Sequence, residues 1–305
     1  MKYLIIVPVL LFNFSALSQT KFEISNYPLE NEYKTISRDS AELLFKQIKE
    51  SKTFEFDYTR GGCDYRAHAV YLLLKKQGIP SFKIWNFAAS KIWNYSIQFK
   101  IPDIDFNQHN LLLTAKDRIN LSTESSYYSE CGDNVIKSTI YWGYHVAPIL
   151  LVKNEDKIDT LVVDPAMFNN LVKPKTWLKA QLQEKSNSYY TYLDGGLISF
   201  QTSSINTLTG LFYDDEYSIK QKKIEESLSK GKVFVEYYEN EIKPLEIELN
   251  KYPKDTDSPE AKSLACEIAN RKNIVFNELV VMLPIEYKNK FNKYVKEATQ
   301  YLFEN

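Results

Sequence analysis

The spacing of apolar residues over the first third of the chain predicts two helices followed by two strands. Apolar residues recur every three or four positions over 39–51 and again over 63–77, which predicts two amphipathic helices. Basic residues and Gly78 at the end of the second segment are typical helix stop signals. Alternating or short apolar runs predict strands over 80–87 and 93–101.

Two later apolar runs predict an antiparallel hairpin. The runs span 145–152 and 160–164, and the polar segment 153–157 joins them. Proline cannot donate a backbone hydrogen bond to a neighbouring strand, so we expect Pro148 to lie on an edge strand or at a bulge.

The symmetry of this hairpin predicts its register. With the turn centred between Asn154 and Glu155, His145 lies directly opposite Asp164 on one face of the sheet. Side chains paired in this way have Cβ atoms about 4.5 to 5.5 Å apart. The register therefore predicts contact between an imidazole and a carboxylate.

The last third of the chain changes to lysine- and glutamate-rich helical sequence. We expect one amphipathic stretch over 219–249 interrupted at Gly231 and Pro244, a second helix over 259–282 capped by Ser258, and a last helix over 285–303. The charges along these helices are typical of solvated faces in a helical bundle.

The first eighteen residues have the pattern of a secretory signal peptide. One basic residue, Lys2, precedes an apolar core over 3–12, and small residues precede the predicted cleavage after Ser18. The apolar core is too short for a comfortable membrane span. We therefore expect an exported protein, periplasmic or extracellular, without membrane insertion.

The composition is that of a folded and nearly neutral chain. It holds 38 basic and 39 acidic residues, which argues against nucleic acid or an anionic membrane as a partner. Three cysteines leave at least one unpaired, and we expect Cys131 and Cys266 to be separate thiols rather than a disulfide, although a bridge stays open. No spacing of Cys, His and carboxylates matches a metal site, so neither metal nor cofactor is expected.

Cys63 is the candidate nucleophile. It follows a Gly-Gly pair and begins the predicted helix, where Ala67, Val70, Tyr71 and Leu74 continue one buried stripe below it. Free backbone N–H groups and the positive end of the helix dipole favour a thiolate there, with a pKa below the ordinary value of about 8.5. The alternative is that Cys63 is a small buried hydrophobic residue.

His145 and Asp164 complete a set of three. A carboxylate beside an imidazole holds one tautomer and stabilises its protonated form, which is what a Cys-His pair needs. Taken singly, His145 could be a core histidine and Asp164 a turn former before Pro165. Together with Cys63 they indicate a cysteine hydrolase acting on amides.

Three segments carry a resemblance to a known family. Residues 62–68, 142–147 and 163–168 resemble the bacterial protein-glutaminases, secreted cysteine enzymes that deamidate glutamine side chains in proteins and peptides. The resemblance covers roughly 40–220. It implies that the cysteine, histidine and aspartate of the three segments form a catalytic triad, that the fold is transglutaminase-like, and that no cofactor is required.

The order of elements predicts the fold class and the domains. We expect an α+β, papain/transglutaminase-like catalytic domain, with a nucleophile helix and an antiparallel sheet, followed by a C-terminal helical bundle. The expected boundaries are a signal peptide over 1–18, a catalytic domain over 19–218 and a helical region over 219–305 that could offer a partner surface. An insertion at about 90–138 could form a lid or specificity loop.

Three neighbours of the triad are candidates for substrate binding. Trp142 and Tyr144 flank the histidine and could hold the aliphatic part of a glutamine side chain, although packing in the sheet is an equal alternative. Arg66 lies one helical turn from the cysteine and could reach a carbonyl, or form a structural ion pair. His68 lies about 140° around the helix and is excluded from catalysis.

These residues predict deamidation of peptide- or protein-bound glutamine to glutamate through a thioester, with release of ammonia. Two alternatives share the triad: a transglutaminase, which passes the acyl group to an amine, and a cysteine peptidase. A third is a non-catalytic exported binding module whose helical region performs recognition.

Overall fold

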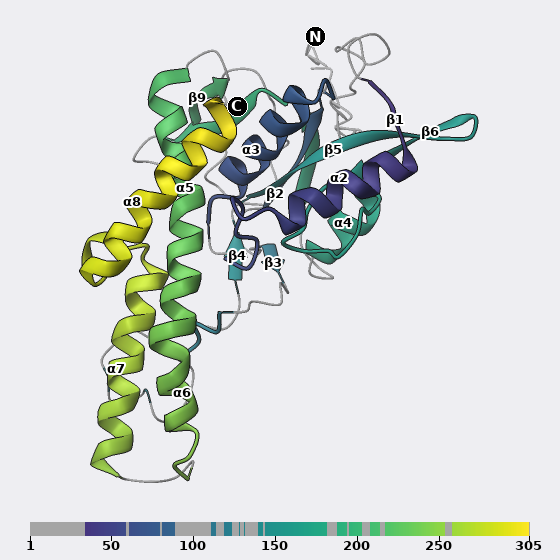
Figure 1. Cartoon of the computed structure of the whole chain (residues 1–305). Helices are drawn as coiled ribbons and strands as arrows, with labels where there is room; N and C mark the ends of the chain where they lie inside the picture. The colour runs from purple at the N-terminus through teal and green to yellow at the C-terminus, as the bar shows by residue number, and fades with distance from the viewer. Residues whose placement is uncertain are drawn as a thin grey trace, which may run out of the picture.

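The computed structural model of this chain is a mixed α+β protein (Figure 1). It describes residues 34–58, 61–79, 81–88, 111–113, 119–123, 128, 131, 140–142, 144–181, 188–193, 195–202, 208–213, 217–253 and 258–304. The predicted signal peptide over 1–18 and the predicted strand over 93–101 lie outside the described residues.

The two predicted N-terminal helices are confirmed. Helix α2 (Arg38–Glu50) begins at Ser37, whose hydroxyl accepts a hydrogen bond from the backbone N–H of Ser40. Helix α3 (Cys63–Lys76) begins after Gly62, which adopts a left-handed φ of 68°. That conformation turns the chain sharply into the helix, so that the candidate nucleophile is its first residue.

A five-stranded sheet forms the centre of the α+β part. Its order is β1 (Ile36–Ser37), β5 (Tyr144–Asn154), β2 (Phe82–Ala88) and β7 (Ser188–Leu193), and β6 (Lys157–Val162) also pairs with β5. All of these pairings are antiparallel except that of β1 with β5. The predicted strands 80–87, 145–152 and 160–164 thus correspond to β2, β5 and β6.

Smaller elements complete this part of the molecule. Two separate antiparallel pairs are β3 (Leu111–Leu113) with β4 (Ile140–Trp142), and β8 (Leu197–Thr202) with β9 (Leu208–Tyr213). Helix α4 (Pro174–Gln181) follows β6 along the chain. The sequence patterns did not predict these three strands and this helix: β7, β8, β9 and α4.

Different helices pack against the two faces of β5. Leu150 and Val152 pack in a cluster with residues of α2 and α3, whereas Ala147 and Ile149 pack in a cluster with Trp177 of α4. This alternation follows from the two-residue period of a strand. Helices α2 and α3 therefore cover one face of the sheet, and α4 covers the other.

The predicted hairpin forms, but its register differs from the expected one. Asn154 pairs with Lys157, so the turn is centred between Glu155 and Asp156 and Ile149 lies opposite Val162. Glu155 adopts a positive φ of 53° in this turn. The expected direct pairing of the histidine with the aspartate is wrong by two positions, an even shift that leaves both side chains on the same face.

Pro148 pairs with Lys83 of β2 and lies one residue beyond the point where β6 ends beside β5, so the expected edge position is confirmed on that side. The alternative of a bulge is wrong, because the β2–β5 register runs without interruption past Pro148. Its carbonyl accepts a hydrogen bond from the N–H of Val163 on the β6 side. Since N–H and C=O of one residue point to the same side in an antiparallel strand, the missing N–H faces the point where β6 ends.

The C-terminal helices extend away from the sheet as a long helical region (Figure 1). This region consists of α5 (Tyr217–Tyr237), a π-helical turn, α6 (Lys243–Leu249), α7 (Pro259–Phe276) and α8 (Ile285–Thr299). The cap at Ser258 is confirmed, because its side chain accepts the N–H of Ala261.

The expected interruption at Gly231 is wrong. The glycine lies inside α5, against the side chains of Glu55 and Tyr58. The expected interruption at Pro244 is confirmed, because the helix takes π form at Tyr238–Ile242 and α6 begins at Lys243 with Pro244 in its first turn.

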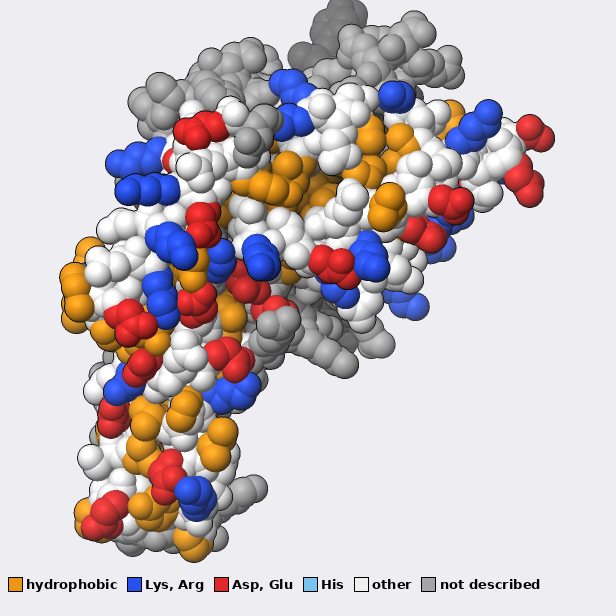
Figure 2. All heavy atoms as spheres, in the orientation of Figure 1, with side chains coloured by type: hydrophobic (Ala, Val, Ile, Leu, Met, Phe, Trp, Pro, Cys, Tyr) orange, Lys and Arg blue, Asp and Glu red, His pale blue; other side chains and the backbone are white. Residues whose placement is uncertain are grey.

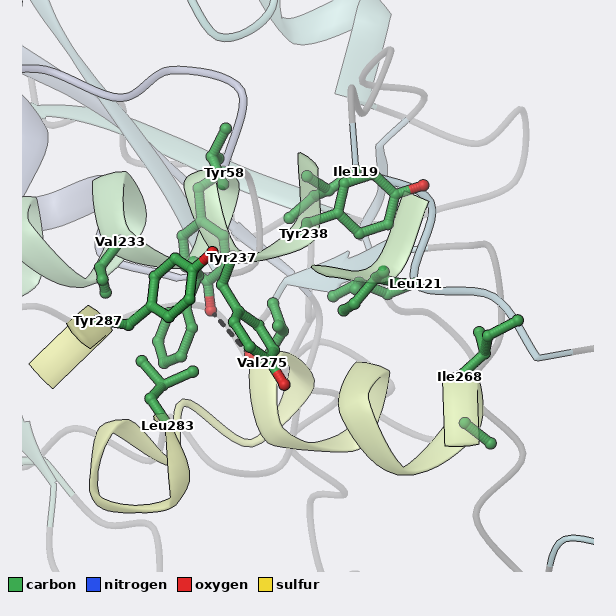
Figure 3. Close-up of a cluster of buried hydrophobic side chains, with 14 of the residues drawn as sticks. Tyr58, Ile119, Leu121, Val233, Tyr237, Tyr238, Ile268, Val275, Leu283 and Tyr287 are labelled. Carbon is green, nitrogen blue, oxygen red and sulfur yellow. Dashed lines mark hydrogen bonds between the residues drawn. The ribbon is translucent and has the colours of Figure 1, made fainter. Parts of the chain in front are cut away.

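The second part of the insertion packs against the helical region. Ile119, Leu121 and Tyr128 belong to a buried cluster shared with α5 and α7 (Figure 3). Cys131 and Cys266 form a disulfide, which corrects the expectation of two separate thiols. The bridge forms because this packing holds their Cα atoms 5.0 Å apart. The remaining residues of the insertion lie outside the described residues, and its expected role as a lid or specificity loop stays a prediction.

No helix among the described residues has both the length and the apolar character needed to span a lipid bilayer.

Candidate active site

Cys63 lies against an open edge of β5. Strand β6 stops at Val162, opposite Ile149, so it does not extend beside the first half of β5. The Cys63 sulfur lies 3.9 Å from the carbonyl oxygen of Tyr144 and accepts a hydrogen bond from the N–H of Val146. The thiol therefore contacts the main chain of Tyr144 and Val146, the two residues that flank the predicted His145.

The expectation of a lowered pKa for this thiol is wrong. Burial raises the pKa of Cys63 above its ordinary value, and the neighbouring charge of Asp64 raises it further. The positive charge of Arg66 and the N–H groups of Val146 and Asp64 act in the opposite direction but are outweighed. The resting thiol is therefore neutral, and a base is needed to remove its proton.

The predicted base and carboxylate are in contact. His145 and Asp164 are both buried, and the imidazole Nε2 lies 2.8 Å from Oδ2 of the carboxylate. In the observed register Asp164 is diagonal to His145, a relation that still brings side chains on one face within reach. Burial alone would raise the pKa of Asp164, but His145 and hydrogen bonds hold it below its ordinary value.

Trp177 is a member of the site that sequence reasoning missed. Its indole N–H donates a hydrogen bond of 2.7 Å to the same Oδ2 of Asp164. Its ring is fully buried and stacks on His145 with centroids 5.3 Å apart and planes 20° apart. One tryptophan thus holds both the carboxylate and the imidazole. Tryptophan in an amphipathic segment is typical of a core residue, so no local signal distinguishes this role.

A buried amide pair lies behind Trp177. The Asn86 side-chain N–H donates to Oε1 of Gln181, 3.2 Å away, and the Gln181 amide donates to the carbonyl of Trp177. Asn86 is the residue opposite His145 in the β2–β5 pairing. These contacts fix α4 against the strands and so fix the indole.

A pocket of about 290 Å³ brings the predicted residues together. Cys63, Arg66, His145 and Asp164 line it, along with apolar side chains that include Phe56. The nucleophile comes from the helix on one face of the sheet, while the histidine and aspartate point to the other face. They meet at this pocket because the edge of β5 is open there.

Arg66 is a buried guanidinium in this pocket. The side chain is 6% exposed, and its Nη2 atom makes no hydrogen bond with any described residue. A buried charge of this kind is costly unless it acts on a partner. Here its positive charge lowers the pKa of both Cys63 and Asp164.

Of the other two candidates for substrate binding, Tyr144 is not among the described residues that line the pocket, and the side chain of Trp142 lies outside the described part of the structure. Tyr144 is half-buried, its hydroxyl donates a hydrogen bond of 3.0 Å to Asp64, and its ring packs beside Trp85. Trp142 ends β4, where it pairs with Leu111. Tyr144 contributes to the site through its carbonyl oxygen, which contacts the sulfur.

The exclusion of His68 agrees with its surroundings. Its ring is fully buried, and Nδ1 lies 3.0 Å from the ammonium of Lys83, which also donates to the carbonyl of Leu197. Among the residues that the structure describes, no group of three or more His, Cys, Asp or Glu side chains could hold a metal ion.

Comparison with known proteins gives one family. Residues 41–181 match the family model described as glutaminase, a segment that contains all four polar residues of the pocket. A comparison with curated proteins finds no match to this chain.

Similar solved structures include a crystal structure of pro-protein-glutaminase, at 18% identity and a TM-score of 0.43, over 66% of this chain and 60% of that one. A crystal structure of protein-glutaminase matches at 18% identity and a TM-score of 0.41, over 66% of this chain and 89% of that one. The NMR structure of protein-glutaminase from Chryseobacterium proteolyticum has the same identity and TM-score, over 66% of this chain and 88% of that one.

Proposed function

We propose that this chain deamidates the side chains of peptide- and protein-bound glutamine, since residues 41–181 match the family model described as glutaminase. The proposed catalytic residues are Cys63, His145 and Asp164. The observation that carries the proposal is the 2.8 Å contact between the imidazole and the carboxylate in a pocket that the thiol also lines.

The proposed first half-reaction forms a thioester. His145 takes the thiol proton as the Cys63 sulfur attacks the side-chain carbonyl carbon of glutamine. The imidazolium then donates this proton to the amide nitrogen, the C–N bond breaks, and ammonia leaves. Because burial raises the pKa of the thiol, proton transfer accompanies the attack and no stable thiolate is formed beforehand.

The proposed second half-reaction consumes water. His145 takes a proton from a water molecule whose oxygen attacks the thioester carbonyl, the C–S bond breaks, and the proton returns to the sulfur. The product is glutamate. Asp164 stabilises the imidazolium in both halves, and its lowered pKa keeps it ionised to do so.

The surroundings of the triad support a role in holding the substrate. The guanidinium of Arg66 faces the pocket and offers a donor for a substrate carbonyl oxygen. Apolar side chains beside it, including Phe56 and Val70, suit the methylene groups of glutamine. We place the enzyme outside the cytoplasm, on the strength of the predicted signal peptide.

The decisive experiment compares Cys63→Ala with the unaltered protein on a blocked glutaminyl peptide. We expect release of ammonia and a one-unit mass increase with the unaltered protein, and a loss of at least about a thousandfold with the variant, as for removal of a covalent nucleophile. Circular dichroism and thermal unfolding of the variant should be unchanged.

Full activity in the Cys63→Ala variant would overturn the proposal. Incorporation of a labelled primary amine into the peptide would instead indicate a transglutaminase, and cleavage of the chain a peptidase. No mass change with any protein substrate, together with a thiol that resists iodoacetamide, would indicate a binding module.

A further inference from the structure

The segment between α7 and α8, which includes Glu278, contacts the Gly61–Gly62 turn that precedes Cys63. A Cβ added to Gly61 would lie 2.8 Å from Oε1 of Glu278, so the carboxylate lies directly against this glycine. A Cβ on Gly62 would lie 2.2 Å from the hydroxyl oxygen of Ser227 in α5. Two parts of the helical region thus hold the Gly61–Gly62 turn from two sides.

The backbone of Glu278 is in a conformation that glutamate rarely adopts. Its φ is 53°, in the left-handed region, directly after the end of α7 and its cap residue Asn277. Helices commonly end with glycine at this position, because glycine has no Cβ to clash there. A residue that keeps an unfavourable conformation is often retained for its side chain.

The side chain of Glu278 is held by groups from two other segments. The hydroxyl of Tyr58 donates to Oε1 at 3.2 Å, and the ammonium of Lys230 lies 3.4 Å from Oε2. Tyr58 is 2% exposed, and its single hydroxyl hydrogen is shared between Glu278 and the carbonyl of Val275, 3.4 Å away (Figure 3). The carboxylate is therefore fixed relative to the buried core of the helical region.

We propose that Glu278 is a positioning residue for the nucleophile. Its carboxylate, anchored by Tyr58 and Lys230, fixes the Gly61–Gly62 turn, and this turn sets where the first residue of α3 places its sulfur. The inference rests on the proposed function of Cys63. It gives the helical region a part in the reaction without contact with the substrate.

The test is the substitution Glu278→Gly in the full chain. Glycine suits the left-handed backbone, so thermal stability should be unchanged or higher, whereas loss of the carboxylate frees the turn. We expect kcat to fall by about tenfold with less than about a twofold change in KM, since small misplacement of a reacting group slows the chemical step. The rate at which iodoacetamide alkylates Cys63 should fall with kcat.

Glu155→Gly is the matched control. Glu155 has the same φ of 53° but lies in the β5–β6 turn, so this variant should gain stability without any change in kcat or alkylation. Glu278→Gln keeps an acceptor for Tyr58 and should retain most activity. If Glu278→Gly does not fold, Glu278→Asn serves instead, because asparagine tolerates this backbone but is too short to reach Gly61.

A folded Glu278→Gly variant with unaltered kcat and unaltered alkylation overturns the inference. Equal losses in the Glu155→Gly control would overturn it as well, because the effect would then belong to the backbone. Alkylation is read by the mass of the Cys63 peptide, since Cys131 and Cys266 are bridged. Alkylation of Cys63 does not require deamidation. If the alkylation rate falls in Glu278→Gly but the unaltered protein does not deamidate glutamine, the proposed function fails while the positioning role of Glu278 stands.

Discussion

The segment that matches the family model and the C-terminal helical region bury different kinds of side chain. The first buries polar and ionisable groups on or next to its strands and on α3 and α4: Asp64, Arg66, His68, Lys83, Asn86, His145, Asp164 and Gln181. The core of the helical region is apolar and aromatic, and most of its charges form pairs near the surface. Figure 2 shows both signs of charge interspersed over that region.

This difference indicates that the two regions have different roles. Buried polar groups cost stability unless they are fully bonded, and they are retained where chemistry needs them. Exposed ion pairs contribute little, about 0 to 1 kcal/mol each, so the helical region depends on its apolar core. We therefore expect substitutions in the first region to change chemistry, and those in the helical core to change stability.

The largest expected effect concerns Lys272, which breaks the pattern of the helical region. It is 1% exposed, pairs with Glu246 at 2.6 Å, and donates to the carbonyl of Ser122 in the insertion. Lys272→Met removes the charge partner of Glu246, which keeps the hydrogen bond from the hydroxyl of Tyr238, and should lower the free energy of unfolding by about 2 to 4 kcal/mol. Urea titration measures this loss, and kcat of the folded protein should be unchanged.

Lys293→Met is the control for this prediction. Lys293 pairs with Glu297 at 3.6 Å with both side chains exposed, so we expect a change below about 0.5 kcal/mol. A fall in kcat for folded Lys272→Met would contradict the division, since it would connect the interior of the helical region to the chemistry.

The next effect concerns Trp177. Trp177→Phe keeps a ring against His145 but removes the N–H that donates to Asp164. The carboxylate loses one of its two side-chain hydrogen bonds, so we expect kcat to fall by about tenfold. Steady-state kinetics measures this, and Tyr237→Phe, a buried ring in the helical core, should leave kcat unaltered.

Trp177→Phe should also change how the stability of the protein depends on pH in acid. The pKa of Asp164 is lowered in the folded protein, so its contribution to stability is complete above the unfolded value of about 3.9 and is lost as pH falls through the folded value. Without the indole N–H the folded pKa rises, so Trp177→Phe should lose less stability on acidification than the unaltered protein. Equal acid unfolding curves would show that the hydrogen bond does not hold the carboxylate.

Local signals in the sequence were sufficient for the helices and strands that frame the site. Helices α2 and α3 were predicted within one residue at each end, because their caps and apolar stripes are local features. The β5–β6 register was missed because Glu155 and Asp156 lack the Gly or Asn that marks most tight turns.

What the sequence could not predict depends on contacts between distant segments. Trp177 joins the site only because α4 folds back under β6, and the disulfide forms only because the insertion docks on α7. The pKa of Cys63 was mispredicted for the same reason. The helix dipole is a local feature, whereas burial and the charge of Asp64 belong to the folded surroundings, and these dominate.

The smallest expected effect tests that balance directly, through Asp64→Asn. The asparagine oxygen can still accept the hydroxyl of Tyr144, so the geometry remains while the negative charge beside the thiol is removed. The pKa of Cys63 should then fall, and alkylation near pH 8 should become a few times faster, roughly twofold to fivefold. Asp159→Asn, on the exposed part of β6, should leave the rate unchanged.

The stability of Asp64→Asn should change with a definite sign. Burial raises the pKa of Asp64 in the folded protein, so ionisation of this carboxyl destabilises the fold above the unfolded value of about 3.9. The variant should therefore be more stable than the unaltered protein at neutral pH, and this gain should vanish below about pH 4. A loss of stability at neutral pH would mean that the charge of Asp64 stabilises the fold. It would contradict the expectation that buried polar groups of the first region serve chemistry rather than stability.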